Sequence, residues 1–145
     1  MKRGIFLAIL GVLLLVAPDP ALSEDKAAKC DIQRGPCTAR TSDGVTVVFD
    51  IQPKPVVAMA ELKFFVTIGP PGMSTASVSS LALDLSMPAM YMGPNQPVLK
   101  RTGSGRYEGT GIIPRCVTGK KTWKAAIIMR LPDRVSIAAF LFEVN

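Results

Sequence analysis

The sequence contains no histidine among its 145 residues. Histidine is the commonest general base in enzymes and the commonest metal ligand in proteins. The protein therefore lacks the usual residue for both roles. The sequence also lacks Gly-x-Ser-x-Gly and Ser-x-x-Lys motifs, a phosphate-binding glycine loop before a helix, and any cluster of carboxylates. We therefore expect that the protein is not an enzyme. Its basic residues are scattered and not interleaved with aromatics, which argues against a nucleic-acid partner.

The first 23 residues have the pattern of a cleaved signal peptide. Lys2 and Arg3 precede an uncharged apolar run over residues 4–17, and Ala21-Leu22-Ser23 offers small residues for cleavage. We predict a periplasmic or secreted protein that begins at residue 24. A membrane anchor is the alternative, although the apolar run is shorter than the roughly 20 residues that span a bilayer.

Turn-forming residues interrupt the mature chain at intervals of about 8 to 12 residues, which predicts an all-β sandwich or barrel. We interpret residues 24–40 as an irregular leader and residues 41–145 as one β-sandwich domain. Between the turns lie about seven strands, the number in an immunoglobulin-like sandwich. The expected strands are 45–51, 62–68, 78–85, 98–101, 106–113, 122–131 and 135–144. Trp123 belongs to an apolar stripe and is expected in the core. Gly109-Thr110-Gly111 suggests an irregularity within a strand.

The chain has three cysteines, Cys30, Cys37 and Cys116, so one of them is left over from any single disulfide. A local Cys30–Cys37 bridge is feasible, because Gly35-Pro36 forms a turn between them. Closing the longer loop from Cys37 to Cys116 would contribute more, about 4 to 5 kcal/mol by the chain-entropy argument. We therefore predict a Cys37–Cys116 disulfide. A redox role for Cys30 and Cys37 is a further alternative, although their spacing differs from Cys-x-x-Cys.

Three of the seven methionines, Met87, Met90 and Met92, fall within six residues. Thioether sulfur is a soft ligand that selects Cu(I), and three ligands suffice for a trigonal site. Residues 90 and 92 share a face if the segment is extended. Met59 and a free Cys30 thiol are additional candidate ligands. In the alternative interpretation, these methionines fill gaps in the core or form an adaptable contact surface for a partner protein.

Three segments carry a resemblance to a known family. They are Met-Pro-Ala-Met-Tyr-Met-Gly-Pro-Asn-Gln-Pro-Val-Leu (87–99), Gly-Arg-Tyr-Glu-Gly (105–109) and Pro-Arg-Cys-Val-Thr-Gly-Lys-Lys-Thr-Trp-Lys-Ala (114–125). Together they resemble small exported YtkA-like and FixH-like domains. The N-terminal Cys-Asp-Ile-Gln-Arg-Gly-Pro-Cys (30–37) resembles a subset of these proteins.

The resemblance implies an immunoglobulin-like sandwich, distantly related to periplasmic copper carriers of the CopC type, and a link to copper handling and cytochrome oxidase assembly. Carriers of the CopC type bind Cu(II) through histidines, so the sequence leaves only a sulfur site for Cu(I). We expect an accessory or binding protein of the cell envelope, either a Cu(I) carrier or a respiratory-complex assembly factor, with a membrane or envelope protein as partner. The alternative is a structural or protein-interaction module without a metal.

Overall fold

The computed structural model describes residues 26–69 and 78–145. The predicted signal peptide, residues 1–23, lies outside the described residues. Within the described ranges the chain forms no helix, and thus none that is long and apolar enough to cross a membrane.

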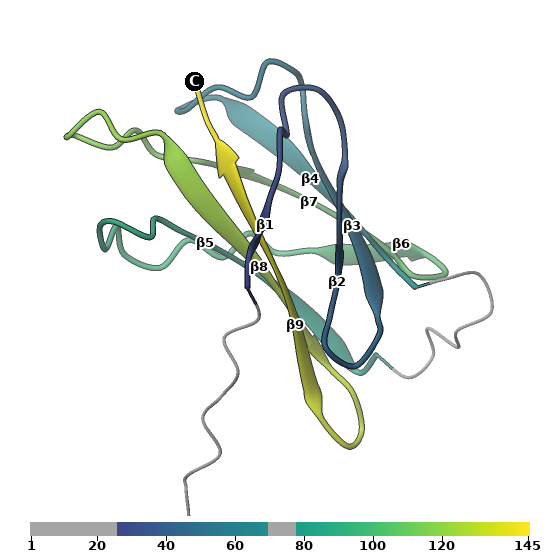
Figure 1. Ribbon diagram of the computed structural model, residues 1–145. Helices are drawn as coiled ribbons and strands as arrows, with labels where there is room; N and C mark the ends of the chain where they lie inside the picture. The colour runs from purple at the N-terminus through teal and green to yellow at the C-terminus, as the bar shows by residue number, and fades with distance from the viewer. Residues whose placement is uncertain (1–25, 70–77) are drawn as a thin grey trace, which may run out of the picture.

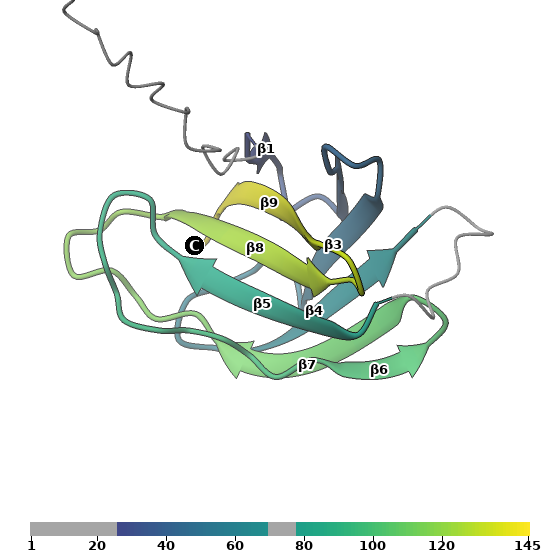
Figure 2. The ribbon, with the colours of Figure 1, turned by 90° about the horizontal axis from the view of Figure 1, so that it is seen from below.

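The described residues form nine strands in two sheets that pack face to face (Figures 1 and 2). One sheet has the order β1-β9-β8-β5 and the other has the order β2-β3-β4-β7-β6. The strands are β1 (Ala28–Lys29), β2 (Cys37–Arg40), β3 (Thr46–Gln52), β4 (Glu61–Ile68), β5 (Ser80–Ser86), β6 (Lys100–Gly103), β7 (Arg106–Ile112), β8 (Thr122–Arg130) and β9 (Val135–Glu143). The prediction of a β-sandwich is confirmed.

The seven predicted strands correspond to β3 through β9, and no end differs from its predicted position by more than two residues. The order β3-β4-β7-β6 faces β9-β8-β5. This is the arrangement ABED against GFC of a constant-type immunoglobulin domain. The strand order and the strand count therefore both support the immunoglobulin-like interpretation.

The core lies between the two sheets and follows from strict alternation along the strands. In β8, the buried positions include Trp123, which is 1% exposed, while its neighbours in sequence are more exposed. From the opposite sheet, the Phe49 ring packs on Phe140 and Phe142 of β9, with ring centroids 5.6 and 6.0 Å apart. Because successive side chains of a strand point to opposite faces, the sequence pattern alone places these residues inside.

The N-terminal segment is not the irregular leader that we predicted. Strand β1 pairs in parallel with β9, and β2 pairs antiparallel with β3. Ile32, between them, is fully buried. These strands have two and four residues, which is too short for an alternating pattern to be recognised. The sandwich therefore begins within residues 24–40 and not at residue 41.

The predicted Cys37–Cys116 disulfide is wrong. The bridge joins Cys30 to Cys37, whose Cα atoms are 5.8 Å apart, and Cys116 is a free, buried cysteine. Strands β1 and β2 lie at neighbouring edges of opposite sheets and are joined by a short turn (Figure 1). The disulfide links the two sulfurs across this turn. The chain-entropy argument compares unfolded chains only, so it could not detect this native proximity.

At one end of the sandwich, Asp43 ties the β2–β3 turn to the β8–β9 turn. Arg134 Nε and Ser136 Oγ donate hydrogen bonds of 2.7 Å to its two carboxylate oxygens. Thr41 donates a third hydrogen bond. Burial raises the pKa of Asp43, but these hydrogen bonds outweigh it and lower the pKa to about 2, from an ordinary value of 3.8. The carboxylate is thus stabilised in its charged form.

We expect Asp43 to contribute stability above about pH 4 that is lost as the pH falls towards 2, because its pKa is lower in the folded than in the unfolded chain. Partial solvent exposure of the pair limits the effect to about 1 to 2 kcal/mol. Urea unfolding of wild type and Asp43→Asn should differ by this amount at pH 7 and converge near pH 2. Asp31→Asn, in an exposed ion pair with Arg34, is the control and should change stability little. An Asp43→Asn defect that persists at pH 2 would contradict the assignment.

Candidate functional site

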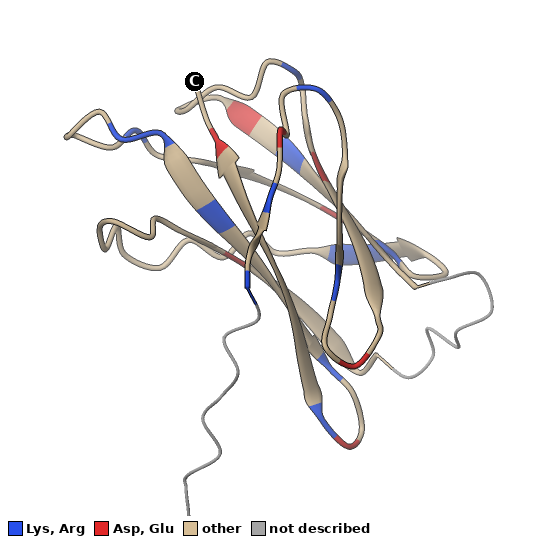
Figure 3. Ribbon diagram, in the orientation of Figure 1, with Lys and Arg blue, Asp and Glu red and all other residues tan. Residues whose placement is uncertain are grey.

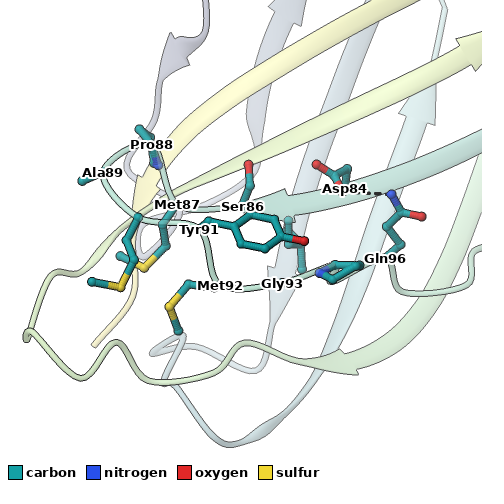
Figure 4. Close-up of a pocket in the computed structure, with 12 residues that line it drawn as sticks. Asp84, Ser86, Met87, Pro88, Ala89, Tyr91, Met92, Gly93 and Gln96 are labelled. Carbon is teal, nitrogen blue, oxygen red and sulfur yellow. Dashed lines mark hydrogen bonds between the residues drawn. The ribbon is translucent and has the colours of Figure 1, made fainter.

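The methionine-rich segment lies in the connection between β5 and β6, at one end of the sandwich (Figures 1 and 4). Met87 and Met90 form an isolated antiparallel bridge, and Met90 N–H donates to the Met87 carbonyl at 3.3 Å. Pro88 and Ala89 are the central residues of this tight turn, where proline at the first central position is favoured. Gly93 then adopts a φ of 80°, a conformation that side chains disfavour. The sequence therefore folds this segment back on itself.

Three hydrogen bonds hold the second arm of the loop, the part that contains Asn95 and Gln96, against the two sheets. Leu85 N–H donates to the Asn95 carbonyl at 2.8 Å, and the Gln96 amide donates to the Asp84 carboxylate at 3.0 Å. The Asn95 side chain donates to the Ile112 carbonyl of β7 at 3.1 Å. The arm therefore connects β5 in one sheet to β7 in the other, and the loop is fixed at both ends.

Two of the three thioethers are more exposed than an ordinary core methionine, whereas Met87 is itself a core residue. Met129 in β8 is fully buried, whereas Met90 and Met92 are half-buried and Met87 is 6% exposed. Figure 4 shows the side chains of Met87 and Met92 on the same side of the loop, with Tyr91 pointing away. Tyr91 is 86% exposed. The alternation across 91 and 92 agrees with the extended geometry expected from the sequence.

The loop borders an open groove of about 580 Å³. Its walls are residues 84–94 together with Gln96. The segment from residue 85 to residue 99 contains no charged side chain, and Figure 3 shows the β5–β6 connection without a basic or acidic residue. The groove thus offers thioether sulfur and main-chain atoms. Its one charged wall residue is Asp84, whose carboxylate accepts the hydrogen bond from Gln96.

Cys116 lies in the connection between β7 and β8, beside the methionine loop (Figures 1 and 2). Its Sγ is 3.9 Å from Met90 Sδ and 3.1 Å from the Thr118 hydroxyl. Only 4% of Cys116 is exposed. Hydrogen bonds from the Thr118 side chain and backbone lower the pKa of the Cys116 thiol, burial opposes them, and the backbone and charge of Lys120 add to the lowering.

Cys116 also borders a second cavity of about 310 Å³, shared with Trp123 and the side chains of Arg115, Lys120 and Lys121. Trp123 and Cys116 therefore border the same cavity, which is distinct from the groove beside the methionine loop. The sequence interpretation missed Cys116 as a site residue because it assigned this cysteine to a disulfide. The short spacing between Cys30 and Cys37 was the available signal that Cys116 would be left free.

The other two candidate ligands have different surroundings. The Cys30 sulfur is part of the disulfide, so the prediction of a free Cys30 thiol ligand is wrong. Met59 lies in the β3–β4 connection with a φ of 65° and is 64% exposed. Its backbone N–H donates to the Ile113 carbonyl at 2.9 Å. The role of Met59 as an additional ligand stays a prediction, and the ligand set proposed below does not depend on it. Within residues 26–69 and 78–145, no group of three or more His, Cys, Asp or Glu side chains could hold a metal.

The fold and site define a class: an immunoglobulin-like β-sandwich with a sulfur-rich loop at one end. No protein-family model matches the chain, and no curated protein and no solved structure matches it either. The resemblance to YtkA-like and FixH-like domains therefore stays a prediction.

Proposed function

We propose that the protein is an exported, non-enzymatic accessory protein of the cell envelope that binds Cu(I) through Met87, Met90 and Met92. The observation that supports this proposal is the uncharged, hydrogen-bonded loop over residues 85–99, which holds three thioethers within six residues. Those of Met90 and Met92 are half-buried and that of Met87 is buried. Soft thioether ligands select Cu(I) over hard ions. A Cu(I) carrier or a factor that delivers copper during assembly of a respiratory complex would use such a site, with a membrane or envelope protein as partner.

The bridge between Met87 and Met90 brings two of the ligands together. Residues directly opposite each other in an antiparallel pair have Cβ atoms about 4.5 to 5.5 Å apart and project to the same face. Two thioethers on such a pair can reach one ion between them. Met92 lies on the same side of the loop as Met87 (Figure 4) and can supply a third sulfur, which completes a trigonal set.

The second candidate function is a protein-interaction module in which this loop contacts a partner without a metal. The observation that favours it is the exposure of Tyr91, at 86%, beside adaptable methionines. The two candidates differ in a direct way, since only the first requires the sulfur atoms.

Cu(I) titration of the mature, disulfide-intact protein against a chromophoric Cu(I) chelator, without oxygen, tests the proposal. We expect wild type to compete for Cu(I), and the triple variant Met87→Leu/Met90→Leu/Met92→Leu to lose this competition, because leucine has no sulfur that can bind the ion. Leucine preserves volume, so the fold should persist, and circular dichroism checks this.

Met59→Leu is the matched control and should bind as wild type. Failure of wild type to compete, or equal affinity in the triple variant, would rule out the thioether site. In the interaction module, the triple variant would leave partner binding intact and Tyr91→Ala would weaken it.

A further inference from the structure

We infer that Cys116 is a fourth ligand, so that Cu(I) binds between the β5–β6 loop and the β7–β8 connection as a mixed thioether and thiolate site. This inference rests on the proposed function. It concerns a cysteine that we had predicted, from the sequence, to form a disulfide with Cys37. The proposed site then no longer consists of one loop alone, because its ligands come from two connections whose sulfurs are in contact.

The distance between the two sulfurs supports shared coordination. Met90 Sδ and Cys116 Sγ are 3.9 Å apart. Thiolate sulfur binds a d¹⁰ metal ion at about 2.3 Å, so two sulfur ligands of one trigonal or tetrahedral ion lie about 3.8 to 4.0 Å apart. The pair therefore already has the separation that a common metal ion requires, although it is formed by residues 26 positions apart in the sequence.

The chemistry of Cys116 also suits a ligand. The other two cysteines of the chain form the disulfide, so Cys116 has the one free thiol. The Thr118 hydroxyl, 3.1 Å from its sulfur, can donate to a thiolate and hold it in place. At 4% exposure the sulfur is protected from bulk oxidants but remains in contact with Met90.

The charges around the site favour a thiolate. Arg115, Lys120 and Lys121 line the cavity beside Cys116, and Figure 3 shows basic residues in the β7–β8 connection. Cu(I) bound by thioethers alone would keep its positive charge beside these cations. With a thiolate ligand the complex is neutral. In the binding step, Cys116 releases its thiol proton to solvent and a sulfur–copper bond forms, with no change in the oxidation state of either atom.

The test uses the mature protein with its disulfide intact, under the same anaerobic conditions. We expect Cys116→Ser to lower the Cu(I) affinity about 10-fold to 100-fold. Wild type should release one proton for each Cu(I) bound in weakly buffered solution, and Cys116→Ser should release none. Bound Cu(I) should also slow alkylation of Cys116 by N-ethylmaleimide at least about 10-fold, as followed by mass spectrometry. Val117→Ser, beside Cys116 and 92% exposed, is the control and should behave as wild type.

The results separate the two proposals. The Cys116 assignment would be overturned if Cys116→Ser bound Cu(I) with the affinity of wild type and released the same number of protons, and if Cu(I) did not slow alkylation of Cys116 in wild type. If the triple methionine variant still bound weakly, the thioether site would remain intact. If wild type itself does not bind Cu(I), both proposals fail. A loss of affinity in both Cys116→Ser and the triple variant supports the combined site.

Discussion

Replacing Trp123 by alanine is expected to lower the free energy of unfolding by about 3 to 5 kcal/mol. Trp123 is 1% exposed in β8, which lies between β9 and β5 within its sheet. Its removal leaves a cavity that the backbone cannot readily close, because β8 is paired with β9 at Trp123 and with both β9 and β5 from Lys124 onward. Denaturant unfolding followed by circular dichroism measures this loss of stability. Tryptophan fluorescence cannot be used, because the variant lacks the single tryptophan of the chain.

Trp123→Phe is the matched control for this variant. It keeps an aromatic ring in the same place and should cost clearly less than the alanine variant. Because Trp123 borders the cavity beside Cys116, Trp123→Ala should also lower the Cu(I) affinity of the proposed site. A stability loss below about 1 kcal/mol would show that the ring does not support the core as its burial indicates.

Replacing Gly109 by alanine is expected to destabilise the fold by up to about 3 kcal/mol. A Cβ atom at this position would lie 2.3 Å from the Val98 carbonyl oxygen and 2.7 Å from the Leu99 side chain. The first of these atoms belongs to the backbone, so the segment that ends the methionine loop has to shift. We therefore also expect a weaker Cu(I) affinity in this variant, measured by the same chelator competition.

Gly35→Ala is the matched control, because a Cβ at Gly35 meets nothing within 4 Å. It should change stability by less than about 0.5 kcal/mol. Equal stability of Gly109→Ala and wild type would mean that residues 97–99 can move away from β7 at little cost, and that the loop is less firmly held than its contacts indicate.

The sequence was sufficient for the main sandwich because its signals are local. Alternation of apolar and polar residues predicted β3 to β9, and it placed Trp123 on the inner stripe of its strand. The pattern failed for β1 and β2, since two to four residues are too few to show a period. The pairing of β1 with β9 joins residues such as Ala28 and Phe140 that are far apart in the sequence, so no local pattern describes it.

Two tertiary contacts near the site could not be predicted from the sequence: that of Met90 with Cys116 and that of Gly109 with Val98. The methionine cluster is visible in the sequence, but the contact of Met90 with Cys116 requires two loops to meet. Gly109 was interpreted as part of a strand irregularity, yet it lies in a regular part of β7. Its lack of a side chain is explained by the close approach of Val98, a tertiary contact that turn and strand preferences cannot reveal.

The two open sides of the sandwich are each crossed by covalent chain. On one side the Cys30–Cys37 bridge joins β1 in the first sheet to β2 in the second, and on the other side residues 95–99 pass from β5 to β7 and β6. These crossings oppose sliding of one sheet over the other. The contact between Met90 and Cys116 is thus already present in the fold. For the proposed Cu(I) site, the conformational entropy of bringing the two loops together would be lost during folding and not during binding. The affinity of that site should then depend on residues that do not contact the metal.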